Sequence, residues 1–565
     1  MATKAGRKAK YSGILSLGLV NGGINVRSGQ MTLKKNQTKK AANISLLLEG
    51  GFTKTPGFTA VCTLPTPIQG LMLYERGGIA SSPKGQISFE MLAYHYSSIS
   101  RVDVRTGTFT TIKNNLKAEG RPQYAQDNAG NMHIVDGVNT PVYFNGSTIS
   151  NVTWPPVYTA TQSTQLPGSI LAGTGANYAF LGNVIDCTFY QNRMWYVTDI
   201  DPAIVAYSKS SKTGGTASTD FQTNDGSSTP VDIAGYATLP AITPFTGIEA
   251  TPNGMLMYGQ NSTGRLLGQN PFGLGLPDPF RYETINSTIG LLSPHLLGKM
   301  SDNEQIVVAN NGVFVITLSD NFQEVRPGQM SYDVQPIFDA IGRYNMSTGR
   351  LLIAPHSGIA ILAIPRNNTS LQRNALWVLH FGVGAKAKPK TLPWMLNEEF
   401  SGTPTSINDM VVDPSDNTIY LAVGDTIYKW SGTSYFNSGS IRSEYQFAPN
   451  DFGFPSINKY ISAYNITYKS ITGATFRLDH AWDNQDGGST TVTVPAKTVP
   501  LIDSAIIGTD KLSFRSAFKD SAYRFPIAGG QIGKNFILTF LHDSATEDLT
   551  IYDIQVEYDV LGEGA

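Results

Sequence analysis

Alternating apolar and polar positions dominate residues 60–435, and the alternating runs come in pairs. In Tyr124 to Asp136 and in Met410 to Val423, two such runs flank a tight turn rich in Asn, Asp or Gly. Alternation with a period of two places every second side chain on one face, so each pair predicts a β-hairpin. Further copies cover residues 89–104, 187–197, 248–258, 306–316 and 351–361.

The centres of six of these turns are spaced almost regularly, at intervals of about 46 to 62 residues. They are Gly130, Asn192, Gly254, Gly312, Gly358 and Asn417. Several turns are followed by a third strand, such as Thr426 to Trp430. Three or four short strands per repeat of this length are typical of the blades of a β-propeller. We therefore predict an all-β fold in which residues 61–440 form a propeller of about seven blades.

The pattern changes near Ser443 to longer alternating strands. Five are predicted, at residues 460–470, 474–480, 490–494, 535–541 and 549–558. Antiparallel strands with one apolar face bury that face by packing as two sheets. Residues 441–565 are therefore predicted to form an additional C-terminal β-sandwich domain.

Two local segments depart from the hairpin pattern. Val334 to Arg343 predicts a helix, because Pro336 suits the first turn and the apolar residues that follow it share one face. Lys209 to Val231 consists mainly of Ser, Thr, Gly, Asn and Asp, and it offers almost nothing apolar to bury. This loop is predicted to project from the body, to be dispensable for folding, and to touch a neighbouring subunit or the host.

Composition supports a folded, β-rich chain of 565 residues. Hydrophobic residues make up 41% and charged residues only 15%, which argues against disorder. The two cysteines, Cys62 and Cys187, indicate no disulfide framework, so assembly in a reducing host cytoplasm is expected.

The net charge of −1 conceals a strong polarity along the chain. Residues 1–40 carry nine Lys or Arg and no acid, whereas Asp543 to Glu563 hold seven acids and no base. We therefore assign residues 1–60 to a basic N-terminal arm and assembly segment. An arm of this kind could bind nucleic acid, but we favour contact with an acidic surface of a sister subunit.

Motifs for catalysis or for binding a cofactor or metal are missing from the sequence. The seven histidines are scattered singly, and there is no nucleophile elbow, phosphate-binding loop or Cys-x-x-Cys pair. Trp482 to Gly488 resembles a calcium loop, but Trp482 stands where the first Asp is needed, so a hairpin turn is predicted. We predict no enzymatic activity, no cofactor and no metal site.

The alternative function is a receptor-binding or carbohydrate-processing propeller at a virion or cell surface. Paired carboxylates would be needed for glycoside cleavage. Asp413, Asp416 and Asp425 are the candidates, but each lies in or beside a predicted turn, where Asp serves turn geometry.

A resemblance to a known family rests on three stretches. The first is Gly22-Gly-Ile-Asn followed by Asn36 to Phe58, which contains the Glu49-Gly-Gly, Lys54 and Pro56-Gly elements. The others are Asp451 to Tyr460 and Ile551 to Tyr558, the latter followed by Gly562. These stretches resemble the tail nozzle proteins, also called tail tubular or tail stabilisation proteins, of short-tailed bacteriophages. The resemblance implies an assembly motif made of Gly22, Gly23, Glu49, Gly50, Gly51, Lys54, Pro56 and Gly57.

The resemblance implies a structural protein of the virion tail. Such proteins form a homo-oligomer, a hexameric ring or tube, below the portal and the tail adaptor, and they meet the tail fibres. The genome leaves through their lumen, so double-stranded DNA would pass without sequence-specific binding, and contact with the host envelope would follow. Outside residues 1–40 the chain is about ten charges negative, which suits a conduit that must not hold phosphates.

Overall fold

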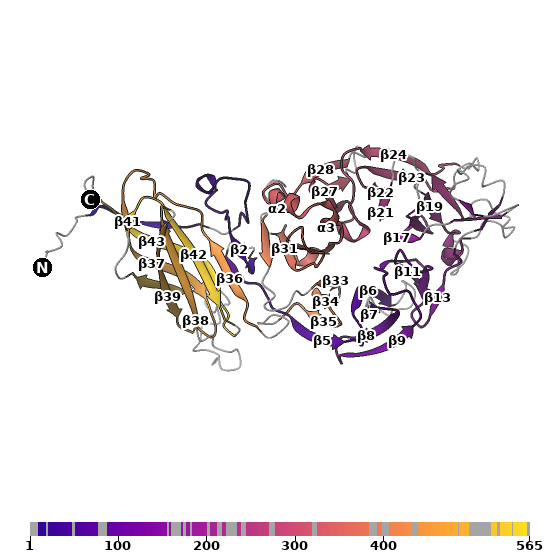
Figure 1. The fold of residues 1–565 in the computed structure, drawn as a ribbon, viewed down its shortest axis with the longest axis horizontal. Coiled ribbons are helices and arrows are strands. Elements are labelled where there is room, and N and C mark those ends of the chain that lie inside the picture. Colours follow the sequence, from indigo (N-terminus) through magenta and orange to yellow (C-terminus); the bar gives the residue numbers. More distant parts are fainter. Residues whose placement is uncertain are drawn as a thin grey trace, which may run out of the picture.

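The computed structural model is an elongated molecule with a ring of blades on one side and a two-sheet unit on the other (Figure 1). It describes residues 9–18, 21–47, 51–76, 88–154, 157–159, 171–172, 177–180, 183–199, 204–211, 217–221, 234–238, 244–270, 277–318, 325–382, 393–397, 406–431, 439–483, 485–496, 521–527, 532–544 and 546–561.

Six four-stranded antiparallel sheets in the described residues stand alone as blades. In chain order, the first blade consists of β6 (Ile68–Arg76), β7 (Ser88–His95), β8 (Ser98–Asp103) and β9 (Thr108–Lys113). The second consists of β10 (Gln123–Gln126), β11 (Met132–Val135), β12 (Val142–Phe144) and β13 (Ile149–Asn151). The third consists of β17 (Val184–Tyr190), β18 (Arg193–Thr198), β19 (Ile204–Tyr207) and β20 (Gly235–Thr238). The next two are β21 (Phe245–Thr251), β22 (Gly254–Gly259), β23 (Thr263–Leu267), β24 (Arg281–Asn286); and β25 (Leu297–Ser301), β26 (Glu304–Ala309), β27 (Gly312–Leu318), β28 (Val325–Gln329). The last consists of β33 (Ile407–Asp413), β34 (Thr418–Val423), β35 (Thr426–Lys429) and β5 (Thr59–Thr63).

A seventh quartet of the same topology lies between the fifth and the last of these blades. It consists of β29 (Arg350–Ala354), β30 (Ile359–Ile364), β31 (Ala375–His380) and β32 (Trp394–Asn397), and it is one end of a nine-stranded sheet. The predicted all-β fold with a propeller is confirmed. Where about seven blades were expected, six are separate sheets, and the remaining repeat is fused to the second domain.

The predicted turns owe their positions to backbone geometry. All six centres have positive φ: Gly130 (86°), Asn192 (59°), Gly254 (134°), Gly312 (143°), Gly358 (64°) and Asn417 (58°). Gly and Asn tolerate this left-handed region better than other residues, so the sequence marks these turns. Gly312, however, joins the second and third strands of its blade and not the first and second, which makes the predicted spacing uneven.

Two buried aspartates link neighbouring blades around the centre of the ring. Asp186 lies at a bulge of β17, and its carboxylate accepts the N–H of Ile248 in the next blade at 2.8 Å. Asp409 lies at the corresponding bulge of β33 and accepts the N–H of Leu71 in the first blade at 2.7 Å. Asp409 therefore bonds across the point where the ring closes.

The second domain packs two sheets face to face over an aromatic core. One sheet contains β3 (Ile44–Leu46), β4 (Phe52–Lys54), β43 (Thr550–Leu561), β37 (Lys459–Lys469) and β40 (Ser521–Pro526), with β1 (Ala9–Ser16) on β43 and β41 (Ile532–Gly533) on β37. The other continues the nine-stranded sheet through β2 (Ala41–Ala42), β36 (Arg442–Gln446), β42 (Phe536–Asp543), β38 (Ala474–Trp482) and β39 (Gln485–Val494). All five predicted strands are present in the second domain. Trp482 pairs with Gln485 across the predicted hairpin turn.

The segment predicted as a separate arm is, from Ala9 onward, part of this fold. Strand β1 runs antiparallel to β43. Leu17 and Ile24 are 5% and 4% exposed and belong to the main core. Arg27, Lys34, Lys35 and Lys40 are exposed, so the apolar residues between them are free to pack inward.

The long polar loop is anchored, contrary to the sequence-based expectation. Phe221 is fully buried, and its ring stacks on Tyr196 with centroids 4.4 Å apart. Lys209 and Asp220 form an ion pair of 2.8 Å at the base of the loop. Residues 212–216 and 222–233 lie outside the described part of the chain. A single aromatic residue therefore ties a loop of polar composition to the blade.

We expect Phe221→Leu to destabilise the protein by about 1 to 2 kcal/mol, because the smaller side chain loses the ring contact and part of the buried area. Chemical denaturation of the full chain measures this difference. Phe109→Leu is the control, since Phe109 is 38% exposed. Equal effects of the two substitutions would show that the loop contributes nothing to the core.

The predicted helix is present as α2 (Gln335–Ile341), followed by α3 (Arg343–Ser347). Phe338 and Ile341 are buried, as the pattern required. No helix among the described residues is long and apolar enough to cross a membrane.

Candidate functional site

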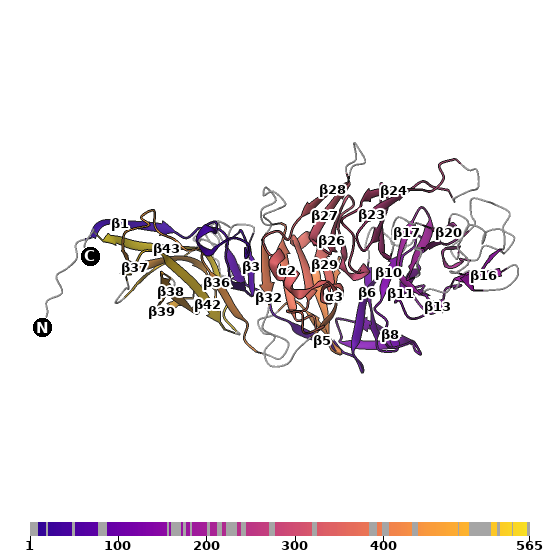
Figure 2. The same ribbon diagram turned by 45° about the horizontal axis from the view of Figure 1, so that its top comes forward.

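Four residues of the predicted assembly motif, Gly22, Gly23, Pro56 and Gly57, lie where the two domains join. Strand β2 lies between β32 of the propeller and β36 of the second domain, with Ala42 paired to both Leu396 and Glu444. One hydrogen-bonded sheet therefore runs from one domain into the other, and β3 and β32 lie at this boundary (Figure 2). A shared sheet resists rotation between the domains, so the junction is a rigid connection.

Gly22 and Gly23 allow the N-terminal segment to approach the propeller closely. The N–H of Gly22 donates to the carbonyl of Asn36 at 2.8 Å. Gly23 has φ of 69°, and a Cβ built there would lie 2.6 Å from the Cα of Pro393. No other residue fits at that distance, and the next residue, Ile24, then donates its N–H to the carbonyl of Trp394 at 3.0 Å.

A buried polar network fixes the same segment to the loop before α2. Gln37 donates to the Asp333 carboxylate at 3.1 Å, and the Asn25 side chain donates to Gln37 at 3.0 Å. The guanidinium of Arg27 lies 4.0 Å from the ring centroid of Tyr332 and donates to its carbonyl at 3.0 Å. The first forty residues thus contact both domains of their own chain.

Lys54 lies on β4 of the second domain and contacts another segment of that domain. Its amine donates to the carbonyl of Ser544. Burial lowers the pKa of this amine, while the carboxylates of Glu547 and Asp543 oppose the shift. The basic and acidic ends of the sequence therefore meet within one chain.

Other contacts support the same conclusion about charge. Lys40 pairs with Glu444 at 2.7 Å, and Ser12 on β1 donates to Asp559 at 2.6 Å. Arg524 binds both carboxylate oxygens of Glu557, at 2.9 and 2.6 Å. These C-terminal acids find partners within their own chain, because both ends of the sequence contribute strands to one unit.

Pro56 and Gly57 lie beside the last blade. The indole N–H of Trp430 donates to the carbonyl of Pro56 at 2.8 Å, and Phe58 stacks on Trp430 with centroids 6.1 Å apart. Thr55 donates its hydroxyl to the side-chain oxygen of Asn397 at 3.0 Å. The Lys-Thr-Pro-Gly stretch therefore connects β4 to β5, that is, one domain to the other.

The motif residue Gly51 lies just before β4. Gly51 is buried, and a Cβ there would meet the carbonyl of Ile551 at 2.8 Å. Glu49 and Gly50 lie outside the described residues.

A cavity of about 320 Å³ opens at this junction. Its walls are Ile44, Ser45, Thr55 and Pro56, then Ser357, Ile359, Val378, His380 and Asn397, and finally Asn417, Thr418, Ile419, Lys429, Trp430 and Ser431. His380 is 4% exposed, and its Nε2 is buried without a hydrogen-bond partner among the described residues. Burial lowers the pKa of His380 to about 4, so the imidazole is neutral at pH 7.

The burial of His380 predicts a loss of stability in acid. Its pKa falls from 6.5 to about 4 on folding, so the unfolded chain binds the proton more tightly. This contribution is complete above pH 6.5 and is lost as the pH falls toward 4, by about 2 to 3 kcal/mol. We expect His380→Asn to weaken the fall in melting temperature over this range. The exposed His356, in the same blade, supplies the control His356→Asn, and an identical pH profile for both variants would contradict the assignment.

No catalytic constellation appears among the described residues. The predicted turn roles hold for Asp413 and Asp416, which accept the N–H groups of Ser415 and Thr418 at 2.9 Å each. Asp425 lies beyond the opposite end of β34 from these two. The described part of the chain holds no group of three or more His, Cys, Asp or Glu residues suited to a metal ion.

One cluster combines Ser, His and Asp but lacks the geometry for catalysis. Ser218 donates to Asp127, not to His133, and the His133 ring shares a 2.7 Å hydrogen bond with the Tyr196 hydroxyl. All four side chains are buried between two blades. The cluster is a structural network that fixes the Ser218 loop.

Comparisons with known proteins identify only the fold. No family model matches this chain, and no curated protein matches it. Among solved structures, the β-propeller domain of Myceliophteria thermophila Cps50 (Swd1) is 9% identical, covering 66% of this chain and 99% of that domain at a TM-score of 0.37. The C-terminal WD40 domain of Sif2 is 11% identical over 66% of this chain and 99% of its own, with a TM-score of 0.35. The extracellular domain of the putative one component system BT4673 from B. thetaiotaomicron is 10% identical over 93% of this chain and 63% of its own, at 0.39. At these scores the assignment of blades rests on the sheets described above.

Sequence reasoning missed most of the junction. His380 and Asn397 come from the seventh quartet and Trp430 follows β35 of the last blade, and no spacing in the sequence connects them. The signal that was available is the pair Gly22-Gly23, since two adjacent glycines after an apolar run mark a place where backbones approach closely.

Proposed function

We propose that the protein is a structural subunit of the tail nozzle of a short-tailed bacteriophage, a hexameric ring below the portal and tail adaptor through which the genome leaves. The observation that carries this proposal is the rigid junction. A shared sheet, the buried Gln37–Asp333 contact and the Trp430–Pro56 contact join two all-β domains into one elongated body. A conduit that withstands ejection needs subunits that do not bend between domains.

The absence of a catalytic cluster among the described residues is consistent with a protein without enzymatic activity. Four of the motif residues that resemble the nozzle family, Gly22, Gly23, Pro56 and Gly57, lie at the domain junction, where they stabilise the subunit itself. Their role is therefore to fix the relative positions of the two domains, while the ring contacts belong to outward-facing side chains.

Strand β1 offers one such surface. It is the strand outside β43, and Ile14 on it is 63% exposed. An exposed apolar side chain on an outer strand suits contact with a second copy of the sheet. We place the ring contact on β1 and the second domain, with the propeller, the tail fibres and the host envelope farther from it.

The test is negative-stain electron microscopy and analytical ultracentrifugation of the purified protein with its tail adaptor. We expect closed rings with a through-going channel, and we expect Ile14→Lys to abolish them. Leu371→Lys is the matched control, because Leu371 is 49% exposed but lies in the propeller. A wild-type protein that stays monomeric with the adaptor at every concentration would refute the proposal.

A further inference from the structure

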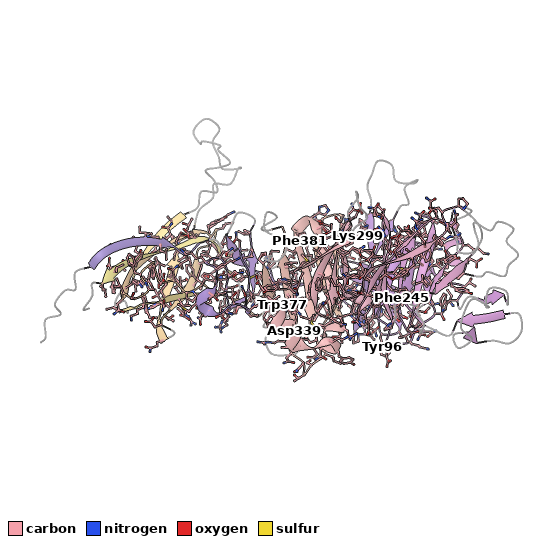
Figure 3. All side chains as sticks on the ribbon, turned by 90° about the horizontal axis from the view of Figure 1, so that it is seen from above. Tyr96, Phe245, Lys299, Asp339, Trp377 and Phe381 are labelled. Atoms are coloured by element: carbon pink, nitrogen blue, oxygen red, sulfur yellow. The ribbon has the colours of Figure 1, made fainter. Side chains whose placement is uncertain are left out.

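A second cavity lies at the domain junction, on the opposite face of the shared sheet from the cavity that contains His380. Its volume is about 330 Å³. Trp377 and Leu396 line it, whereas their neighbours Val378 and Asn397 line the first cavity. Because successive residues of a strand point to opposite faces, the sheet separates the two cavities. Figure 3 labels Trp377 on the side of the propeller nearest the second domain.

The floor of this second cavity is apolar. Trp377 and Ile24 are 2% and 4% exposed, and Ile337 and Leu396 are half-buried. These four side chains come from the N-terminal segment, from helix α2 and from two strands of the seventh quartet. A side chain that enters the cavity from outside therefore meets apolar surface, and its burial there is favourable.

Positive charge surrounds this apolar floor. Four of the lining residues are basic and one is acidic, namely Lys39, Lys40, Arg366, Arg442 and Glu444. Lys40 pairs with Glu444 at 2.7 Å, which leaves an excess of three positive charges around the cavity. A concave site lined by one sign of charge concentrates ligands of the opposite sign. The lining therefore selects for negatively charged groups.

The walls of this cavity are already held in place by the fold. The Nζ of Lys39 donates to the carbonyls of Val26 and Ser28, which fixes the N-terminal segment at the rim. Arg442 is exposed, and its guanidinium makes no hydrogen bond or ion pair with any described residue. Its donors are thus available at the edge of a preformed cavity, and preorganisation lowers the entropic cost of binding.

We propose that this second cavity binds an acidic peptide segment of a partner protein. One apolar side chain of the segment lies on the Trp377 floor, and carboxylates beside it bind Arg442 and Arg366. Apolar anchors in pockets with a charged rim are the usual centre of protein interfaces. A DNA duplex, with a persistence length of about 50 nm, is too stiff to enter the cavity and would touch only its rim. The inference goes beyond the proposed nozzle and does not depend on it.

The first measurement is isothermal titration of the full chain with the capped peptide Glu-Glu-Phe-Glu-Glu at low salt. We expect saturable binding that weakens in about 1 M salt, where the Debye length falls to about 3 Å. The peptide Glu-Glu-Ala-Glu-Glu lacks the apolar anchor, and we expect it to bind about tenfold more weakly. No saturable heat, or equal affinity for the two peptides, would overturn the proposal.

Variants and a competitor locate the site. Arg442→Gln is expected to weaken peptide binding about tenfold, through the loss of one charge-assisted contact, and to leave the melting temperature unchanged. Arg105→Gln is the matched control, because it removes the same charge from an exposed turn of the first blade. If Arg442→Gln alters the melting temperature, Arg366→Gln, also at an exposed position, carries the test. Equal loss in Arg105→Gln, or displacement of the peptide by a short DNA duplex, would contradict the proposal. Ring formation is measured separately, so these outcomes leave the nozzle proposal unaffected.

Discussion

Removal of residues 1–40 is expected to destabilise the whole chain, and not merely to weaken its assembly. The deletion takes away β1, which pairs with β43 from Ala9 to Ser16, and the buried Leu17 and Ile24. Loss of a buried Leu or Ile side chain costs about 2 to 5 kcal/mol, so the total is comparable to the stability of a typical domain. We expect the melting temperature to fall by about 10 °C or more.

Calorimetry of the full-length and truncated chains at low and high salt measures this effect. Deletion of residues 1–8 is the matched control, because the described pairing with β43 begins at Ala9. A truncated protein that melts like the full chain, but no longer forms a ring, would show that the segment is an independent assembly arm. That outcome would restore the interpretation based on charge alone.

Asp409→Ala is expected to cost about 3 to 5 kcal/mol, the range for removing one partner of a buried ion pair. Asp409 is 2% exposed, and it bonds to Arg350 as well as to the N–H of Leu71. Its loss leaves a buried guanidinium less compensated and an N–H unpaired at the closure of the ring.

Chemical denaturation of Asp409→Ala measures this cost, and Asp416→Ala on the same hairpin is its control. Asp416 is exposed and accepts only the N–H of Thr418, so its removal should cost less than about 1 kcal/mol. The expected cost of Asp186→Ala lies between those of Asp409→Ala and Asp416→Ala, because Asp186 bridges blades without a direct arginine partner in the described residues. Equal effects of Asp409→Ala and Asp416→Ala would contradict the bridging role.

The sequence predicted the features that depend on local backbone conformation, namely the turns and the buried faces of the strands. Gly130, Asn192 and Asn417 mark hairpins because few other residues adopt positive φ, and alternation along β37 and β43 fixes which face is buried. Blade repeats and the second domain followed from these short-range rules.

Contacts between residues that lie far apart in the sequence could not be predicted. The expected arm was wrong because Ser12 finds its partner at Asp559, a contact that charge counting does not reveal. The burial of Phe221 was not predicted, because a single aromatic residue in a polar loop creates no periodic pattern of apolar positions. Asp409 and Leu71 meet only because the ring brings the last blade beside the first.

The order in which the strands are made has a consequence for synthesis on the ribosome. Strand β5 leaves the ribosome before any complete blade, yet its partner β35 ends at Lys429, and β1 must wait for β43 at Thr550–Leu561. The propeller cannot close before Lys429 has emerged, and the second domain cannot close before Leu561, and such long-range pairing is slow. A prematurely terminated chain therefore keeps open sheet edges in both halves. Such unpaired edges are the features that chaperones and proteases recognise.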